Sequence, residues 1–528
     1  MKALIYKYLL LVIIGGAIGL SGCNKFLDEL PDNRTEVDSE LKIKKLLVSA
    51  YPTSSYLVPF ELSSDNVDDY GPLNPYGGRF LEQIFRWERI TETGTDSPTI
   101  FWQACYSAIA NANEALEAIE AMGNPASLNP QRGEALAARA YAHFLLVNMF
   151  CQHYAKQYAA TDLGIPYITK PETELVVTYE RKSVKDVYEA IRRDLEEALP
   201  LIDDTSYGTT TSFHMNVATA NAFAARVALY MEEWEDAVRY ANKAIGVNPR
   251  ALMRDNIGIA ANAVSSVSAL AVFYNSSNEK SNLLLQTAYS NQGLYFGASY
   301  TGSRFSHGNL IAREQTFFAN GPFGSYSNTG YRPRVFVYTG TNLDKTLVPR
   351  VSYMFEYTDP VAGIGYRWAV YAPFTTEETM LVRAEALIHL KRYEEAIVDM
   401  KRWVDNSVVD PPATFNMDSV NAWAGRTKYY TALKSTPKKK LNPEFLIEEG
   451  VQENMLHALL HIRRLETMHL GLRWIDVKRY GIEVERRVIA SGEVDVVETA
   501  TKLEKRDKRM ALQLPIEVIT AGLTPNPR

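Results

Sequence analysis

Two separated stretches of the chain share one helical pattern, and such a repeat limits the fold more than a single motif does. Residues 234–238 read Trp-Glu-Asp-Ala-Val, and residues 393–397 read Tyr-Glu-Glu-Ala-Ile. Ala225 and Ala384 precede the two aromatic residues at the same distance, and small residues there let paired helices approach closely. This spacing is typical of the second helix of a tetratricopeptide repeat. The sequence therefore predicts a mostly α fold built on helical repeats.

Further helices are predicted by apolar residues at helical spacing and by their start and stop signals. A first helix is expected around residues 38–51. A second begins at Ser97-Pro98 and stops at Gly123, and a third begins at Asn129-Pro130. These two helices should pair as an antiparallel hairpin. Later helices are expected after Ser183 and from Asn216 through Tyr230.

The helical period fades between about residues 250 and 375, where Gly, Ser, Asn and Tyr dominate. We expect a loop-rich region there, with short strands and turns at most.

The predicted organisation is a signal peptide over 1–22 and a single body over 23–528. That body comprises an N-terminal helical part (23–250), a loop-rich ligand-binding insertion (251–375) and a C-terminal helical part (376–528). Loops on a rigid scaffold commonly carry binding sites.

The first residues of the chain have the features of an export signal. Lys2 and Lys7 are followed by an apolar stretch over residues 8–20, which is too short to cross a bilayer. Leu20-Ser21-Gly22-Cys23 then matches a lipobox. We expect Cys23 to be lipid-modified and to tether the body to a bacterial membrane. An ordinary secretory signal and an uncleaved anchor are the alternatives.

Composition and charge narrow the functional classes. The formal net charge is −6, and no basic stripe suits a phosphate backbone, which argues against a nucleic-acid partner. Besides Cys23 the chain has only Cys105 and Cys151, too few for a four-cysteine zinc site. Both lie on inward stripes of the predicted hairpin. A disulfide between them and two buried thiols both remain open.

Enzyme signatures are scarce. His457 and His461 are four residues apart on a predicted helix, but Ala458 stands where a zinc protease has its glutamate. Asp65, Asp68 and Asp69 resemble the paired carboxylates of a glycosidase, and their hard oxygens also suit calcium. Capping, loop solvation or hydrogen bonding to a ligand explains such a cluster better. We expect no enzyme activity and no cofactor, with calcium as the alternative.

Four segments together resemble the SusD/RagB family, the surface glycan-binding lipoproteins of Bacteroidetes outer membranes. They are the start at Cys23-Asn24-Lys25-Phe26-Leu27-Asp28, the helix from Gly133 through Tyr141, the segment from Arg463 to Arg479 with its Arg-Trp-Ile-Asp-Val-Lys-Arg run, and the ending from Leu514-Pro515 to Asn526-Pro527. The resemblance implies a tetratricopeptide-like scaffold packed against an irregular half. It also implies a lipid-anchored, surface-exposed, non-catalytic protein that sits over a SusC-type TonB-dependent transporter.

Sugar binding requires aromatic faces and polar side chains that bond hydroxyls in fixed directions. Two segments offer both, and in the family the glycan site lies in comparable loops. The candidate ligand-binding residues are Asp65, Asn66, Tyr70, Tyr76 and Arg79 in the first segment, and Tyr289, Tyr295, Tyr300 and Arg304 in the second.

The charged residues of the C-terminal signature need no ligand to explain them. We expect Arg463, Arg464, Glu466, Arg473, Asp476, Lys478 and Arg479 to form charge pairs that hold the terminal segment on the scaffold. The predicted function is binding of oligosaccharide or polysaccharide and its delivery to a transporter. A peptide-binding or scaffold protein on the same fold and a polysaccharide-degrading enzyme are the alternatives, and the sequence does not identify the sugar.

Overall fold

The computed structural model describes residues 37–528, apart from 173–176, 262–265, 298–301, 328–329 and 340–343. The signal peptide and Cys23 therefore lie outside the described residues. The α-helices of the described part are α2 (Glu40–Leu47), α3 (Leu57–Ser63), α4 (Arg79–Phe85), α5 (Pro98–Ala121), α6 (Asn129–Phe150), α7 (Val184–Ala198), α8 (Val217–Tyr230), α9 (Trp234–Ile245), α10 (Asn256–Ala261), α11 (Val267–Tyr274), α12 (Gln292–Tyr295), α13 (Asn309–Glu314), α14 (Thr376–His389), α15 (Tyr393–Ser407), α16 (Met417–Arg426), α17 (Val451–Glu466), α18 (Leu472–Arg479) and α19 (Ile516–Thr520).

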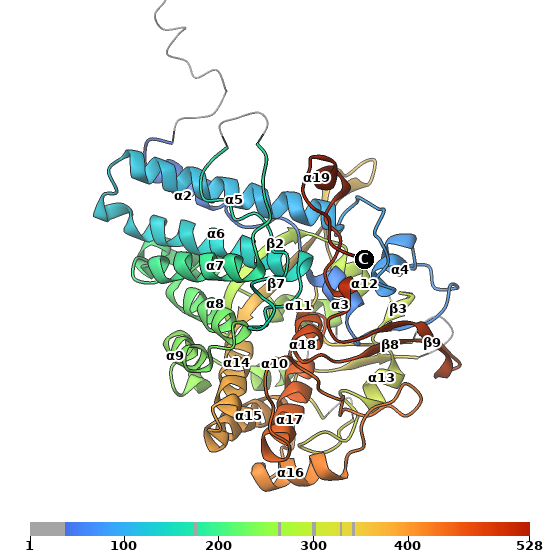
Figure 1. The fold of residues 1–528 in the computed structure, drawn as a ribbon. Coiled ribbons are helices and arrows are strands. Elements are labelled where there is room, and N and C mark those ends of the chain that lie inside the picture. The colour runs from blue at the N-terminus through green and yellow to red at the C-terminus, as the bar shows by residue number, and fades with distance from the viewer. Residues whose placement is uncertain (1–36, 173–176, 262–265, 298–301, 328–329, 340–343) are drawn as a thin grey trace, which may run out of the picture.

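The strands are β1 (Asp68–Asp69), β2 (Asn282–Tyr289), β3 (Phe305–Ser306), β4 (Phe336–Tyr338), β5 (Lys345–Leu347), β6 (Met354–Asp359), β7 (Ile364–Thr375), β8 (Val484–Ala490) and β9 (Glu493–Leu503). They form a four-stranded sheet in the order β3-β1-β8-β9, a three-stranded sheet in the order β2-β7-β6, and the pair β4-β5. Figure 1 shows α2, α5 to α9 and α14 to α16 in an arc along one side, with β3, β8 and β9 of the four-stranded sheet opposite.

The predicted start signals define the helices of the arc. The Ser97 hydroxyl accepts a hydrogen bond from the Ile100 amide at the start of α5, and Ser183 forms a reciprocal capping box with Asp186 at the start of α7. The Asn216 side-chain oxygen caps α8 by accepting a hydrogen bond from the Thr219 amide. Gly123 has a φ of 84°, which suits a residue that ends a helix. The boundaries predicted from these signals are confirmed.

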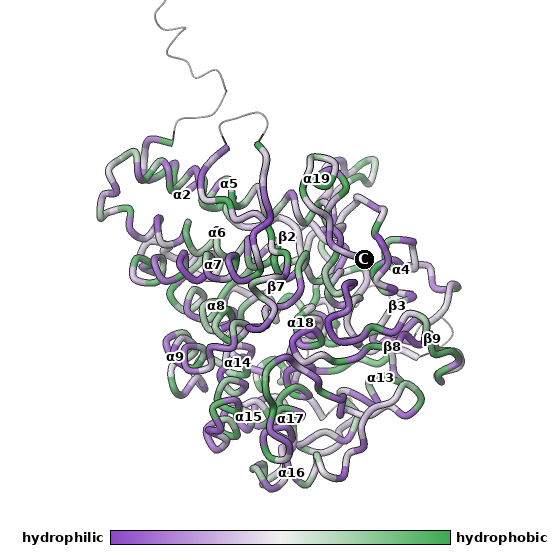
Figure 2. Tube along the Cα trace, in the orientation of Figure 1, coloured by the Kyte–Doolittle hydropathy of each residue, from purple (hydrophilic) through white to green (hydrophobic). Residues whose placement is uncertain are grey.

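The helices pack as consecutive antiparallel pairs, including α5 with α6, α8 with α9, and α14 with α15. Ala225 on α8 and Ala384 on α14 are fully buried, as close helix packing requires. Along the scaffold helices, hydrophobic and hydrophilic residues alternate (Figure 2). The prediction of a mostly helical, tetratricopeptide-like scaffold is confirmed.

The region between residues 250 and 375 is more ordered than predicted. It contributes the eight-residue β2, the twelve-residue β7 and β6, which together form the three-stranded antiparallel sheet. The prediction of short strands at most was wrong, because the Leu283–Leu285 run of β2 is buried without the alternation that marks a half-exposed strand. The sheet is attached to α8, whose Arg226 donates a hydrogen bond to the Pro373 carbonyl of β7.

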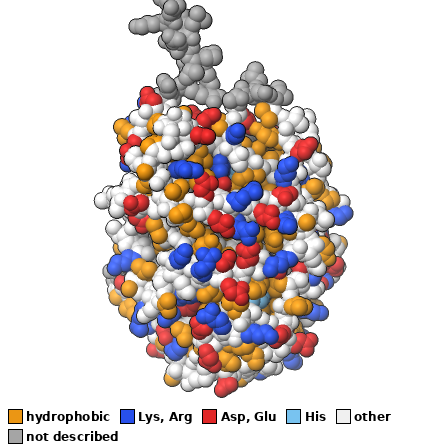
Figure 3. All heavy atoms as spheres, turned by 60° about the vertical axis from the view of Figure 1, so that its left-hand side comes forward, with side chains coloured by type: hydrophobic (Ala, Val, Ile, Leu, Met, Phe, Trp, Pro, Cys, Tyr) orange, Lys and Arg blue, Asp and Glu red, His pale blue; other side chains and the backbone are white. Residues whose placement is uncertain are grey.

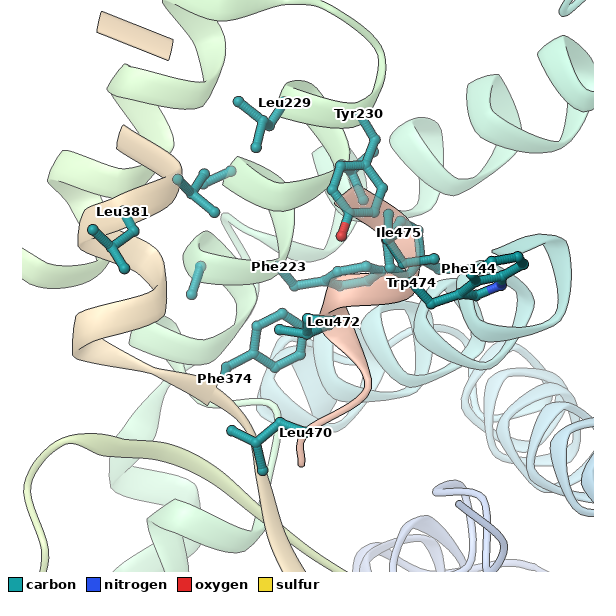
Figure 4. Close-up of a cluster of buried hydrophobic side chains, with 14 of the residues drawn as sticks. Phe144, Phe223, Leu229, Tyr230, Phe374, Leu381, Leu470, Leu472, Trp474 and Ile475 are labelled. Carbon is teal, nitrogen blue, oxygen red and sulfur yellow. The ribbon is translucent and has the colours of Figure 1, made fainter. Parts of the chain in front are cut away.

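One hydrophobic cluster extends from Tyr56 to Leu523 and includes residues of the helical arc, the sheet and the C-terminal segment. At its centre, Phe223 of α8 lies near Phe374 of β7, with ring centroids 5.7 Å apart. Figure 4 shows Trp474 and Ile475 of α18 directed into the same cluster. Apolar contacts therefore fix α18 to the scaffold.

Buried charges of the C-terminal signature join α17 and α18 to the scaffold. Arg463 lies 3.0 Å from a Glu385 oxygen, 3.5 Å from Glu378 and 3.3 Å from Asp476. Arg479 forms a second ion pair with Glu385 at 2.7 Å. Although burial alone would raise it, Arg479 and Arg463 hold the pKa of Glu385 at about 2. These pairs have the structural role that the sequence predicted for the charged set.

Other residues noted in the sequence have ordinary surroundings. His457 and His461 are buried on α17, where burial lowers the pKa of each imidazole below its usual range. Cys105 and Cys151 are buried free thiols.

No helix among the described residues is both long and apolar enough to span a bilayer. The face of the molecule in Figure 3 carries acidic and basic side chains interspersed.

Candidate functional site

The structure brings the two sequence-predicted binding segments together. β1 pairs antiparallel with β3, so that Asp69 lies opposite Phe305. The Tyr70 amide donates to the Arg304 carbonyl at 2.8 Å, and Tyr76 forms an isolated bridge with Ser303. Segments more than two hundred positions apart in the chain are thus neighbours, as a shared site requires.

Two of the predicted polar residues, Asp65 and Asn66, are however buried and bonded to arginines. Arg473 donates two hydrogen bonds to the Asp65 carboxylate, at 2.7 and 2.9 Å. Arg464 lies 3.7 Å from the same carboxylate and donates to the Asn66 side chain at 2.8 Å. Asp65 and Asn66 therefore connect the first segment to α17 and α18, and their ligand contact stays a prediction.

The neighbouring carboxylates are also paired with arginines. Arg487 forms an ion pair with Asp68 at 2.6 Å, and Arg304 forms one with Asp69 at 2.7 Å. These guanidinium groups supply positive charge where calcium would need oxygen ligands. The arrangement favours the structural interpretation of this acidic cluster.

The remaining predicted residues differ in the solvent exposure of their side chains. Tyr70 packs against Gly308, where any added Cβ would collide with the phenol hydroxyl. Tyr295 is largely buried, and burial raises the pKa of its hydroxyl to about 12. Tyr76 is partly buried and Arg79 is exposed at the start of α4. Tyr300 lies outside the described residues.

Among the predicted residues, Tyr289 lies beside two other aromatic rings. Its ring centroid lies 3.8 Å from that of Trp368, with the ring planes inclined by 35°, and 5.6 Å from that of Tyr366. Tyr289 is 37% exposed and Tyr366 is 56% exposed, so these rings are open to solvent. We call Tyr289, Tyr366 and Trp368 the aromatic platform.

The register of the three-stranded sheet explains why these rings meet. Tyr289 of β2 lies opposite Trp368 of β7, which in turn lies opposite Met354 of β6. Tyr366 precedes Trp368 by two residues, so strand alternation places both side chains on one face of the sheet. Cross-strand pairing therefore builds a continuous apolar surface with aromatic rings along it.

Arg367 lies between the two β7 platform residues, so strand alternation directs its side chain to the opposite face of the sheet. Its guanidinium donates a hydrogen bond to the Asn291 side-chain oxygen at 3.2 Å. The Ser290 amide donates to the Arg367 carbonyl at 3.1 Å. The platform itself offers aromatic rings, which suit a ligand with apolar faces, while Arg367 connects β7 to the turn that follows β2.

Sequence reasoning missed Tyr366, Arg367 and Trp368. They belong to a strand that was predicted as loop, and the alternation of aromatic residues within Tyr366-Arg367-Trp368 was the available signal. No local pattern predicted that this strand pairs with the one ending at Tyr289.

A separate cavity of about 770 Å³ lies between α5 and α19. Trp102, Tyr106 and Tyr179 contribute aromatic side chains to its wall. None of the sequence-predicted residues lines this cavity, which makes it an alternative location for a ligand.

Comparison with known proteins assigns the fold. Residues 25–229 match the model of a SusD-like family described as starch-binding and associating with the outer membrane. This region of the chain is therefore similar to SusD-like proteins. The description of that family supports carbohydrate binding and association with the outer membrane. No curated protein matches the chain.

Solved SusD structures share the fold along nearly the whole chain. A SusD superfamily protein from Bacteroides thetaiotaomicron is 17% identical, with a TM-score of 0.62 and coverage of 94% of this chain and 100% of its own. A SusD-like carbohydrate-binding protein from Bacteroides vulgatus is 19% identical, with a TM-score of 0.62 and coverage of 91% and 95%. A putative sugar-binding protein from Bacteroides vulgatus is 18% identical, with a TM-score of 0.61 and coverage of 94% and 99%.

Proposed function

We propose that the protein binds an oligosaccharide or polysaccharide on the aromatic platform and delivers it, without cleaving it, to a TonB-dependent outer-membrane transporter of the SusC type. The observation that carries this proposal is the cluster of the Tyr289, Tyr366 and Trp368 rings, of which Tyr289 and Tyr366 are exposed to solvent, in the region predicted to bind a glycan.

The chemistry of a pyranose fits this surface. The C–H face of a sugar ring packs on an aromatic ring, while its hydroxyls need donors and acceptors with fixed directions. The Tyr289 and Tyr366 rings are exposed and are available for such packing. The starch-binding description of the family supports a carbohydrate as the ligand class.

A panel of polysaccharides in an affinity gel tests this function. Binding predicts that migration of the protein is retarded by at least one glycan and that no reducing ends are released. Release of reducing ends would identify an enzyme instead. Retardation by no glycan, together with binding to peptides, would favour the peptide-binding alternative.

We further propose that the protein is anchored in the outer membrane through a lipid on Cys23. Replacing Cys23 with alanine should move the protein from the membrane to the soluble fraction, because no acyl chains would then be attached. Fractionation and mass measurement of the wild type and the variant check this prediction.

Ser21→Ala is the matched control, because it keeps a small residue before the cysteine. This variant should remain in the membrane with its lipid mass. The anchor proposal is contradicted if Cys23→Ala partitions like the wild type and has lost no lipid mass.

A further inference from the structure

Asp96 is a buried carboxylate beside the platform. Its side chain is fully buried, and no lysine or arginine of the described residues forms an ion pair with it. Its φ of 68° lies in the left-handed region, which is uncommon for a residue with a side chain. Asp96 directly precedes Ser97, the residue that caps α5, so it lies at the start of a scaffold helix. A strained, buried acid at such a place is a candidate for a functional role.

Both carboxylate oxygens of Asp96 bind the turn that follows β2. One accepts a hydrogen bond from the Ser290 hydroxyl at 2.6 Å, and the other accepts one from the Asn291 amide at 2.8 Å. The Gln292 amide in turn donates to the Ser290 hydroxyl at 3.1 Å. Asp96 therefore fixes the backbone immediately after Tyr289.

The same turn connects to the second platform strand. The Ser290 amide donates to the Arg367 carbonyl, and Arg367 donates to the Asn291 side chain. Arg367 lies between Tyr366 and Trp368. Asp96 is thus connected through Ser290 and Asn291 to the backbone that follows Tyr289 on β2 and to the backbone that precedes Trp368 on β7.

We propose that ionised Asp96 is a positioning residue that holds the 290–292 turn, aligns Tyr289 with Trp368, and makes glycan binding by the platform dependent on pH. The binding part of this inference rests on the proposed function, whereas the alignment of the two rings does not.

Protonation removes part of the acceptor capacity that the turn uses. A carboxylate offers lone pairs on both oxygens, whereas the protonated acid has a hydroxyl in place of one acceptor. Burial raises the pKa of Asp96 from 3.8 to about 6, despite the opposing hydrogen bonds from Ser290 and Asn291. Acidification below about pH 6 therefore loosens the turn.

Tyr295 of α12 interacts electrostatically with Asp96. Burial raises the pKa of the Tyr295 hydroxyl to about 12, so this group stays neutral in the same pH range. Because the folded state binds the Asp96 proton more readily than the unfolded chain does, the contribution of this group to stability grows as pH falls from about 6 to 3.8. Asp96 protonation therefore weakens binding without destabilising the fold.

Glycan affinity measured between about pH 5 and pH 8 tests the binding part, with the glycan that the affinity gel identifies as ligand. Wild-type affinity should fall below about pH 6, by at most about tenfold per pH unit for a single proton. Asp96→Asn should bind more weakly at pH 8 and lose this pH dependence. Asp344→Asn is the matched control, because Asp344 also accepts a backbone hydrogen bond and also has a pKa raised by burial.

Asp344→Asn should keep the wild-type profile. A flat wild-type profile, or an Asp96→Asn profile that follows the wild type, would overturn the proposed pH dependence. Thermal unfolding at each pH distinguishes loss of binding from loss of fold.

Near-ultraviolet circular dichroism tests the alignment without any ligand. The difference between wild type and Trp368→Phe reports the Trp368 environment, including its stack on Tyr289. This difference signal should shrink on acidification and in Asp96→Asn. Ser290→Ala keeps the Asp96 carboxylate but removes the hydroxyl that donates a hydrogen bond to it. This variant should also reduce the difference signal, and it replaces Asp96→Asn in the test if Asp96→Asn does not fold. An unchanged signal across these conditions would overturn the positioning role, even if no glycan binds the wild type.

Discussion

Replacing Arg463 with methionine should lower the free energy of unfolding by about 3–5 kcal/mol. Arg463 is fully buried among Glu378, Glu385 and Asp476, with nitrogen–oxygen distances of 3.0 to 3.5 Å. The methionine side chain fills similar space. Among the described residues, Glu378 then keeps its ion pair with Arg226 and Glu385 keeps its pair with Arg479, whereas Asp476 loses its ion pair with Arg463. An uncompensated buried charge is among the largest destabilising effects of a single substitution.

Denaturant unfolding of both proteins measures this difference. Arg392→Met is the control, since it removes an exposed ion pair with Glu395 and should cost less than about 1 kcal/mol. If Arg463→Met were as stable as this control, the buried network would not hold α17 and α18 to the scaffold.

The second large effect is expected for Asp65→Asn, at about 3–5 kcal/mol of unfolding free energy near neutral pH. Asp65 is the carboxylate shared by Arg473, Arg464 and Lys439. Without its charge, three buried cations face one another. Although burial alone would raise it, Arg464, Arg473 and Lys439 hold the pKa of Asp65 well below its usual 3.8.

The sign of the pH dependence follows from this lowered pKa. The stabilisation from ionised Asp65 is fully present above about pH 3.8 and is lost as pH falls through the lower pKa of the folded state. The stability difference between wild type and Asp65→Asn should therefore shrink in acid. Asp236→Asn, at an exposed ion pair with Arg239, is the control and should change stability little. A small effect of Asp65→Asn near neutral pH would argue against a structural role for Asp65.

Local signals were sufficient to predict the helical scaffold. Caps such as Ser97, Ser183 and Asn216 act within one turn of chain, and the stop at Gly123 depends on one backbone angle. The repeated pattern at Trp234 and Tyr393 also depends only on spacing within a helix. Such features can be read from neighbouring residues because their physical causes are local.

The candidate site depended on contacts between distant residues. Tyr289 was predicted as a ligand-binding residue from composition, but its stacking partner Trp368 comes from a strand paired across the sheet. The Asp65 carboxylate could bind a sugar hydroxyl, yet it accepts two hydrogen bonds from Arg473 of α18. Composition identifies available chemistry, whereas tertiary contacts decide which groups remain open.

The glycan affinity of Trp368→Ala, measured by calorimetry beside the wild type and Tyr179→Ala, tests the platform most directly. Tyr179 lines the separate cavity at α5 and provides an aromatic control away from the platform. Binding on the platform predicts that Trp368→Ala loses about 1–3 kcal/mol, or about 5- to 150-fold in affinity, because it removes the ring whose centroid lies 3.8 Å from that of Tyr289. Tyr179→Ala should bind like the wild type. Full affinity in a folded Trp368→Ala protein would contradict the platform as the binding site, and a loss confined to Tyr179→Ala would place the ligand in the cavity.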